Sequence, residues 1–277
     1  PIEAVFTVDE EVGMDGAFAL DCSDLKGRKL LNLDSEIEGV FTVSCAGGMR
    51  ADCHLPGIME PVAGMAGYSI TLAGLQGGHS GGDIHLGRAS ANQVMGRVLY
   101  SAMERFRGLR LAAVSGGQFD NVICSRCDAA VAIPAGKEAE FEAFIAEFDA
   151  ILKNEYAGCD DGITLKCAKA DVTSAVSEAV TNTMLHTLLA LPQGVQAMSV
   201  DFPGLTQTSL NMGVLKLEDD GLHITFSIRS SIASQKEMLA QRVHAIVEFA
   251  GGTVTERGKY PGWQYERDSQ FRDMVLE

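Results

Sequence analysis

The sequence predicts an α/β protein in which a short parallel-sheet region precedes a large α+β domain with an antiparallel sheet flanked by helices. The chain of 277 residues is 46% hydrophobic and 21% charged, as is usual for a folded globular protein. Its first forty residues alternate strand, acidic loop, helix and strand, the layout of a parallel sheet. Beyond them, short alternating strands are interleaved with amphipathic helices. These changes place domain boundaries near residues 39 and 258.

The first forty residues carry the parallel-sheet prediction. Residues 2–8 are apolar and rich in β-branched side chains, which favours a buried strand. Residues 13–20 predict a short helix, and residues 29–33 predict a second strand. In a parallel sheet the functional groups lie beyond the carboxyl ends of the strands, where the acidic residues of this region fall.

Residues 40–258 predict helices on a mainly antiparallel sheet. Residues 137–153 form the clearest helix, because their apolar side chains recur at i, i+3, i+4 and i+7. Glu218-Asp219-Asp220-Gly221 is a turn between two strands. The other predicted helices are 89–106, 174–189, 235–249 and 269–276. The predicted strands are 40–46, 68–75, 109–115, 119–124, 128–133, 162–167, 195–200, 209–217, 222–229 and 252–256.

Charge, hydropathy and cysteine content exclude several classes of protein. The formal net charge of -15 repels phosphate backbones and anionic lipid, so neither nucleic acid nor a membrane is an expected partner. No apolar run approaches the roughly 20 residues that span a bilayer. The seven scattered cysteines predict reduced thiols in a cytoplasmic protein. Cys124 and Cys127 form a lone C-x-x-C without a second pair at zinc-finger spacing, so they predict no metal site.

Two acidic groups follow the two predicted parallel strands. Glu10 and Glu11 come directly after the first strand, and Asp34 ends the second. Adjacent carboxylates repel one another unless a cation or proton offsets the charge, so the cluster suits a metal site. One carboxylate would then bind the ion while its neighbour acts as a general base. A solvated acidic loop is the alternative that the residues alone leave open.

Three further residues are candidates for binding substrate. His79 lies in the glycine-rich stretch of residues 76–83, where it could donate a hydrogen bond to an oxyanion, bind a metal, or be incidental to a turn. Arg229 ends a strand beside serines and suits either a substrate carboxylate or a surface ion pair. Asn121 begins a strand, where an Asx turn is the simpler interpretation. The remaining histidines have no supporting pattern: His54, His85, His186, His223 and His244.

Together these stretches resemble the aminoacyl-histidine (Xaa-His, β-alanyl-histidine) dipeptidases, a branch of the dinuclear-zinc peptidases. The Asp-Glu-Glu motif marks the larger group, whereas Leu-Asp-Ser-Glu, Cys-Ala-Gly-Gly and Gly-Gly-His-Ser-Gly point to the dipeptidase branch. The matching stretches run in order through residues 6–14, 31–36, 41–48, 74–85, 87–92, 227–231 and 260–263.

The resemblance implies a domain layout and a partner. Residues 1–39 would be part of a catalytic domain, residues 40–258 a lid that also forms a homodimer, and residues 259–277 a segment that returns to the catalytic domain. It implies two zinc ions or other divalent metals, a dipeptide substrate, and a fold in which the lid carries the antiparallel sheet.

The resemblance also implies a role for each candidate. Glu10 would be the general base, and Glu11 and Asp34 would each bind one zinc ion. On the lid, His79 would polarise the scissile carbonyl and Arg229 would bind the substrate carboxylate. Asn121 matches a family asparagine, although the following residues, Val-Ile-Cys, depart from the family pattern of Ala-Ile-Pro.

The chain lacks several residues that the family uses. No histidine is followed two residues later by aspartate, no metal-bridging aspartate precedes the Asp-Glu-Glu strand, and no C-terminal histidine is present. We therefore expect a fragment of a zinc dipeptidase that is inactive by itself. Two alternatives remain open, a non-catalytic dimerisation or binding module and a related carboxypeptidase or deacylase.

Overall fold

The chain forms two compact units. The computed structural model describes residues 2–9, 14–33 and 38–277. One unit comprises Pro1–Cys45 with Trp263–Glu277, and the other comprises Ala46–Gly262. The candidate lid residues all belong to the second unit.

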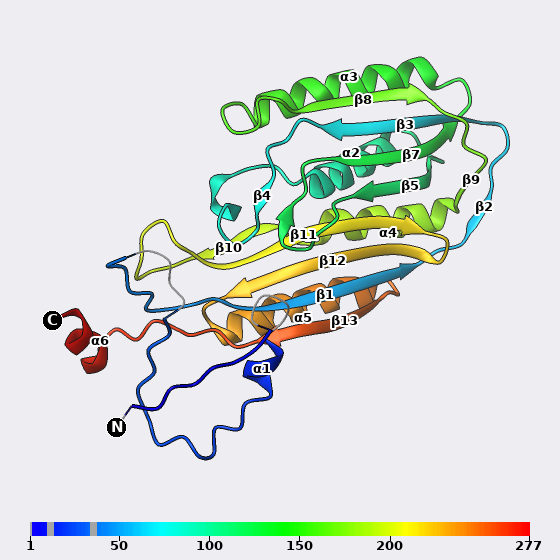
Figure 1. Cartoon of the computed structure of the whole chain (residues 1–277). Coiled ribbons are helices and arrows are strands. Elements are labelled where there is room, and N and C mark those ends of the chain that lie inside the picture. The colour runs from blue at the N-terminus through cyan, green and yellow to red at the C-terminus, as the bar shows by residue number, and fades with distance from the viewer. Residues whose placement is uncertain (1, 10–13, 34–37) are drawn as a thin grey trace. The chain divides into compact units, whose positions relative to one another are not determined.

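A large antiparallel sheet forms the centre of Ala46–Gly262. Among the described residues, its order is β13-β1-β12-β11-β5-β7-β3-β8, with β10 also paired to β11 (Figure 1). Two shorter ribbons pair β2 with β9 and β4 with β6. The strands are β1 (Gly47–Pro56), β2 (Met59–Pro61), β3 (Met65–Ala73), β4 (Gly78–His79), β5 (Arg110–Gly116), β6 (Val122–Ile123), β7 (Cys127–Pro134), β8 (Thr164–Lys169), β9 (Ser174–Val176), β10 (Gly194–Met198), β11 (Thr206–Glu218), β12 (Gly221–Ser230) and β13 (Thr253–Tyr260).

Four long helices pack on this sheet and bury its apolar side. They are α2 (Ala91–Arg105), α3 (Glu138–Glu155), α4 (Glu178–Ala190) and α5 (Ala233–Phe249), and a 3-10 turn, η1, covers Ile84–Leu86. In α3 the apolar stripe expected from the sequence is buried and contacts β8. Helix α5 packs on β1, β12 and β13, and α2 packs on α4 and the middle strands (Figure 1). None of the described helices combines the length and apolar character that crossing a membrane requires.

Strand β1 divides its side chains between two faces of the sheet. Met49, Ala51 and the apolar residues that alternate with them are buried on the side of α5. Arg50 and Asp52 alternate with these residues, so they point to the opposite face. That second face is polar, and it carries the site described below.

The predicted antiparallel domain with flanking helices is confirmed, and two of its local predictions are wrong. Residues 40–46 do not form a strand, and the first strand of this domain, β1, begins at Gly47. Its partners β12 and β13 determine this position, because a strand extends where neighbours supply hydrogen bonds. The helix predicted from residue 174 begins at Glu178, where Ser177 caps the amide of Val180. Residues 174–176 form β9, which pairs with β2.

The smaller unit has little regular structure. It contains α1 (Asp15–Phe18), α6 (Gln270–Leu276) and a bridge in which Cys45 and Trp263 exchange two hydrogen bonds of 2.8 Å. The strands predicted at residues 2–8 and 29–33 are absent there, and the described residues contain no parallel strand pair. The side chains of Ile2 and Phe6 are 99% and 92% exposed. A strand needs a paired neighbour and a covering layer, and the described residues supply neither to these segments.

Candidate functional site

A braced loop between β3 and α2 positions His79. Strand β4 holds the loop to β6, with His79 opposite Val122. The carboxylate of Asp83 accepts a hydrogen bond of 2.9 Å from the His79 amide and forms an ion pair of 3.4 Å with Arg88. Gly78 has a φ of 136°, and a side chain there would collide with Arg88 and Asp83. Glycine is therefore required for this compact loop.

Buried Asp160 fixes both ends of the same loop. Its two carboxylate oxygens accept hydrogen bonds from the amides of Gln76, at 2.6 Å, and Ala89, at 2.7 Å. The side chain is fully buried. A carboxylate that accepts from one amide at each end of the loop makes the loop a defined platform for His79.

The hydrogen bonds of the His79 ring determine its tautomer. Nδ1 accepts hydrogen bonds from the amides of Gly81 and Gly82, at 3.3 and 3.0 Å. An acceptor nitrogen carries no proton, so the neutral ring has its proton on Nε2. His79 is exposed, so Nε2–H is available as a donor to a ligand.

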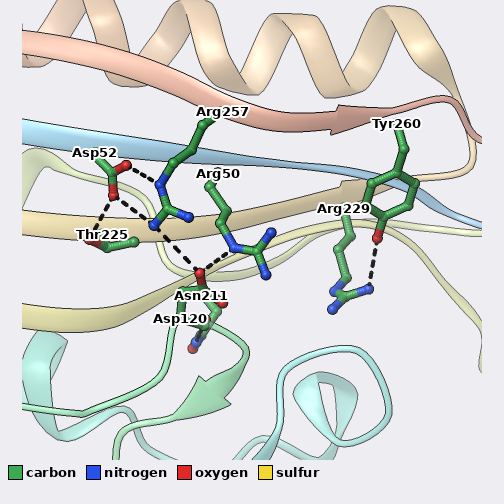
Figure 2. Close-up of polar contacts among 8 residues, drawn as sticks. All are labelled: Arg50, Asp52, Asp120, Asn211, Thr225, Arg229, Arg257 and Tyr260. Atoms are coloured by element: carbon green, nitrogen blue, oxygen red, sulfur yellow. Dashed lines mark hydrogen bonds and ion pairs between the residues drawn. The ribbon is translucent and has the colours of Figure 1, made fainter. Parts of the chain in front are cut away.

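Arg229 lies next to this imidazole. A Cβ atom placed on Gly81 would lie 3.0 Å from His79 Cε1 and 3.5 Å from Arg229 Nε. The Arg229 Nη1 atom donates a hydrogen bond of 3.3 Å to the Tyr260 hydroxyl (Figure 2). Its Nε atom is buried and has no hydrogen-bond partner. The guanidinium group therefore keeps donors that an anionic ligand could use.

Asn121 contacts the His79 loop through its backbone. Its carbonyl accepts a hydrogen bond of 2.9 Å from the amide of Ser80. Buried Asn211 of β11 donates to the carbonyls on either side of it, those of Asp120 at 2.9 Å and Val122 at 2.8 Å. The structure thus brings together the predicted residues His79, Asn121 and Arg229, which are far apart in the sequence.

An ion-pair network occupies the middle of the polar face. Arg257 bonds to both oxygens of Asp52, at 2.5 and 3.3 Å, and Arg50 pairs with Asp120 (Figure 2). Thr225 donates a further hydrogen bond of 2.8 Å to Asp52. Burial raises the pKa of Asp52, but the hydrogen bonds from Arg257 and Thr225 outweigh it and hold the pKa below the usual 3.8. Both carboxylates of this network pair with arginines, whereas Arg229 pairs with no carboxylate among the described residues.

The predicted general base and the two predicted metal ligands cannot be placed in this geometry. Glu10, Glu11 and Asp34 lie outside the described residues. Cys124 and Cys127 are buried, and burial raises the pKa of both thiols, which disfavours the thiolate that binds metals.

Comparison with known proteins finds two dipeptidases that the chain resembles. A model of the peptidase dimerisation domain matches residues 70–159. The whole chain is 36% identical, over 280 aligned residues, to the cytosol non-specific dipeptidase of Escherichia coli (strain K12). The chain is therefore similar to this dipeptidase along its whole length. The crystal structure of aminoacylhistidine dipeptidase from Vibrio alginolyticus matches 97% of the chain with a TM-score of 0.91 and 34% identity.

The chain spans about half of the length of these two relatives. It covers 57% of the Escherichia coli protein and 55% of the Vibrio alginolyticus protein. The family resemblance inferred from the ordered motifs is confirmed by both matches.

Sequence reasoning missed three residues that hold the site in place. Asp160 sits in the turn Cys159-Asp160-Asp161-Gly162, which the sequence does not distinguish from a solvated loop. Asn211 lies within an otherwise ordinary strand, and Tyr260 is distinguished in the sequence only as part of the matching stretch 260–263. A signal for the polar face was present, because polar and apolar residues alternate strictly from Met49 to Leu55.

Proposed function

We propose that this chain is the lid-bearing part of a metal-dependent dipeptidase that hydrolyses Xaa-His type dipeptides. One observation carries the proposal: an imidazole with an exposed Nε2–H lies beside a guanidinium with unused donors, both in one chain. A dipeptide offers a matching pair of groups, a scissile carbonyl oxygen and a free carboxylate close to it.

Each of the lid residues would then have a distinct task. His79 would donate from Nε2 to the carbonyl oxygen, which gains negative charge as water attacks. Arg229 would bind the carboxylate through two parallel hydrogen bonds and so fix the peptide bond next to His79. Asn121 would contact the substrate from the neighbouring turn. Glu10 would take the proton from the attacking water.

The metals belong to the same proposal, but the donors of this chain do not complete their sites. Two divalent ions, zinc by family resemblance, would activate water and polarise the carbonyl. Zinc sites usually have about four ligands, often with imidazole among them. This chain offers each ion one carboxylate, Glu11 or Asp34, and has no His-x-Asp motif. We therefore expect the chain alone to bind these ions weakly and to show no turnover.

A substrate panel tests the activity. The complete protein and this chain are assayed with zinc on β-alanyl-histidine, other Xaa-His dipeptides and dipeptides with other C-terminal residues. The proposal expects turnover only by the complete protein, fastest on Xaa-His substrates. Equal rates on all dipeptides would contradict the Xaa-His preference and match the non-specific activity in the Escherichia coli relative's name. Preference for N-acyl amino acids or longer peptides would favour the deacylase or carboxypeptidase alternative.

Dimerisation is a second proposed function of the larger unit. The match of residues 70–159 to a peptidase dimerisation domain supports a homodimer formed through Ala46–Gly262. Sedimentation equilibrium should give twice the chain mass, and a monomer at every concentration would contradict the proposal. A dimeric complete protein without hydrolase activity would favour the non-catalytic module. The name of the cytosolic relative and the net charge of -15 support a cytoplasmic location without nucleic acid or membrane partners.

A further inference from the structure

Two histidines without any supporting pattern in the sequence meet on the polar face of the sheet. His54 of β1 lies directly opposite His223 of β12 in the antiparallel register. Their rings stack with centroids 4.7 Å apart and an angle of 27° between the planes. The prediction that neither histidine has a supporting pattern is therefore wrong. The two residues meet only because β1 pairs with β12, and the sequence does not reveal this pairing.

Both imidazoles direct Nε2 at the turn between β11 and β12. The Nε2 atom of His223 lies 2.8 Å from Asp220 Oδ1. The Nε2 atom of His54 lies 3.1 Å from the Asp220 carbonyl oxygen and 3.7 Å from Asp220 Oδ2. Two nitrogens and one carboxylate, from strand β1 and from the β11–β12 hairpin, thus lie close to one another.

We propose that His54, Asp220 and His223 form a binding site for a transition-metal dication such as Zn²⁺. One ligand atom from each residue lies within 4.8 Å of the other two, and no other trio of His, Cys, Asp or Glu among the described residues does so. Two imidazoles and a carboxylate are a donor set that Zn²⁺ accepts, with water in the fourth position. Hard cations such as Mg²⁺ prefer oxygen ligands and fit this set poorly.

The surroundings of the three residues favour such an ion. Gly221 has a φ of 144°, and a Cβ atom there would lie 2.9 Å from His54 Nε2, so glycine leaves room for the ring. Lys216 forms an ion pair of 2.6 Å with Glu218 Oε1, so the positive charge of this lysine is offset near the proposed cation site. The other oxygen of Glu218 lies 3.9 Å from His223 Nε2 and can orient a bound water.

The position of the site suggests a structural role. His223 precedes Arg229 by six residues on β12, which is roughly 20 Å along an extended strand. At this distance the ion would not contact a substrate that is bound to Arg229. It would instead tie the end of β1 to the β11–β12 hairpin, so zinc should stabilise this unit against unfolding.

A zinc titration tests the proposal without any assay of activity. Calorimetry and imidazole NMR are run on the full chain carrying Glu11→Gln and Asp34→Asn, which removes the carboxylates proposed for the other ions. We expect a single zinc ion to bind and to shift the His54 and His223 resonances, with no response to Mg²⁺. His54→Ala and His223→Ala should each weaken zinc binding at least about tenfold, because each removes a ligand.

Matched controls make the outcome decisive. His186 is also exposed, on α4, where its Nδ1 contacts the Asn182 carbonyl at 2.8 Å, so His186→Ala should leave zinc binding unchanged. Equal weakening by His186→Ala, or no weakening by His54→Ala, would overturn the proposal. If a histidine variant fails to fold, Asp220→Ala in the exposed turn provides the same test, and unaltered zinc affinity in that variant would also overturn it.

Discussion

Arg257 and Arg229 lie on the same face of the sheet, but their guanidinium groups have different surroundings (Figure 2). Arg257 donates to both oxygens of Asp52 and lies 3.8 Å from Asp120. Arg229 donates to the Tyr260 hydroxyl, and its buried Nε has no partner. An unpaired buried donor costs free energy. This difference supports the proposal that Arg257 stabilises the fold and that Arg229 binds a ligand.

The largest effect is expected at the most completely satisfied polar group, Asp160. In Asp160→Ala the part-buried amide of Gln76 and the buried amide of Ala89 lose their acceptor, so the free energy of unfolding should fall by about 3 kcal/mol. Urea unfolding measures this change. Asp161→Ala, at the neighbouring exposed position, serves as the control and should lose much less. Equal losses of unfolding free energy in the two variants would show that the burial of Asp160 and its two hydrogen bonds do not determine how much it stabilises the fold.

Arg229→Ala should affect ligand binding rather than stability. Removing the guanidinium should weaken binding of a dipeptide with a free carboxylate by about 10- to 100-fold, since hydrogen bonds between charged groups are lost. The dissociation constant is measured by NMR titration, and unfolding is measured in parallel. Arg229→Lys keeps the charge without the planar fork and should be intermediate. Unchanged affinity in Arg229→Ala would remove the proposed role.

Arg257→Ala should show the opposite pattern. Its side chain is 52% exposed, so solvent screening limits the loss of unfolding free energy to about 1 kcal/mol or less. Dipeptide affinity should not change, because Arg257 is already occupied by Asp52. A loss of affinity as large as that of Arg229→Ala would show that the two arginines act as one cationic surface.

The smallest effect is a pH dependence from Asp52. Its pKa is below 3.8 in the folded chain, so the unfolded chain binds more protons as the pH falls toward that value. The contribution is therefore fully present above pH 3.8 and is lost as the pH falls through the folded pKa. Asp52→Asn should be less stable than the original chain at neutral pH, and the gap should narrow in acid. Urea midpoints across a pH series measure the gap, and a constant gap would contradict this account.

Much of the larger unit could be predicted from local pattern. The apolar stripe of α3 and the turn before Gly221 are visible in the sequence because they depend on residues close together in the chain. Strand β1 was misplaced, although its alternation from Met49 to Leu55 was available, because the apolar run at residues 40–46 had the stronger β propensity. Pairing with β12 and β13 places the strand at Gly47–Pro56 and not at residues 40–46, and such pairing depends on segments that are distant in the sequence.

The candidate site was predictable in its residues but not in its arrangement. His79 and Arg229 could be named from their glycine-rich and strand-end contexts. Their proximity depends on the loop that Asp160 anchors and on the β4–β6 ribbon, both of which join distant segments. The meeting of His54 and His223 depends in the same way on strand register. The functions of Glu10, Glu11 and Asp34 remain predictions from the sequence.

The pairing of His79 with Arg229 in one chain is tested most directly by ¹⁵N NMR of the His79 imidazole. The free chain should show the tautomer protonated at Nε2, with Nδ1 as an acceptor. A dipeptide with a free carboxylate should shift the Nε2 resonance, its C-terminal amide should not, and Arg229→Ala should abolish the shift. A ring protonated at Nδ1, or equal shifts with the dipeptide and its amide, would contradict the account.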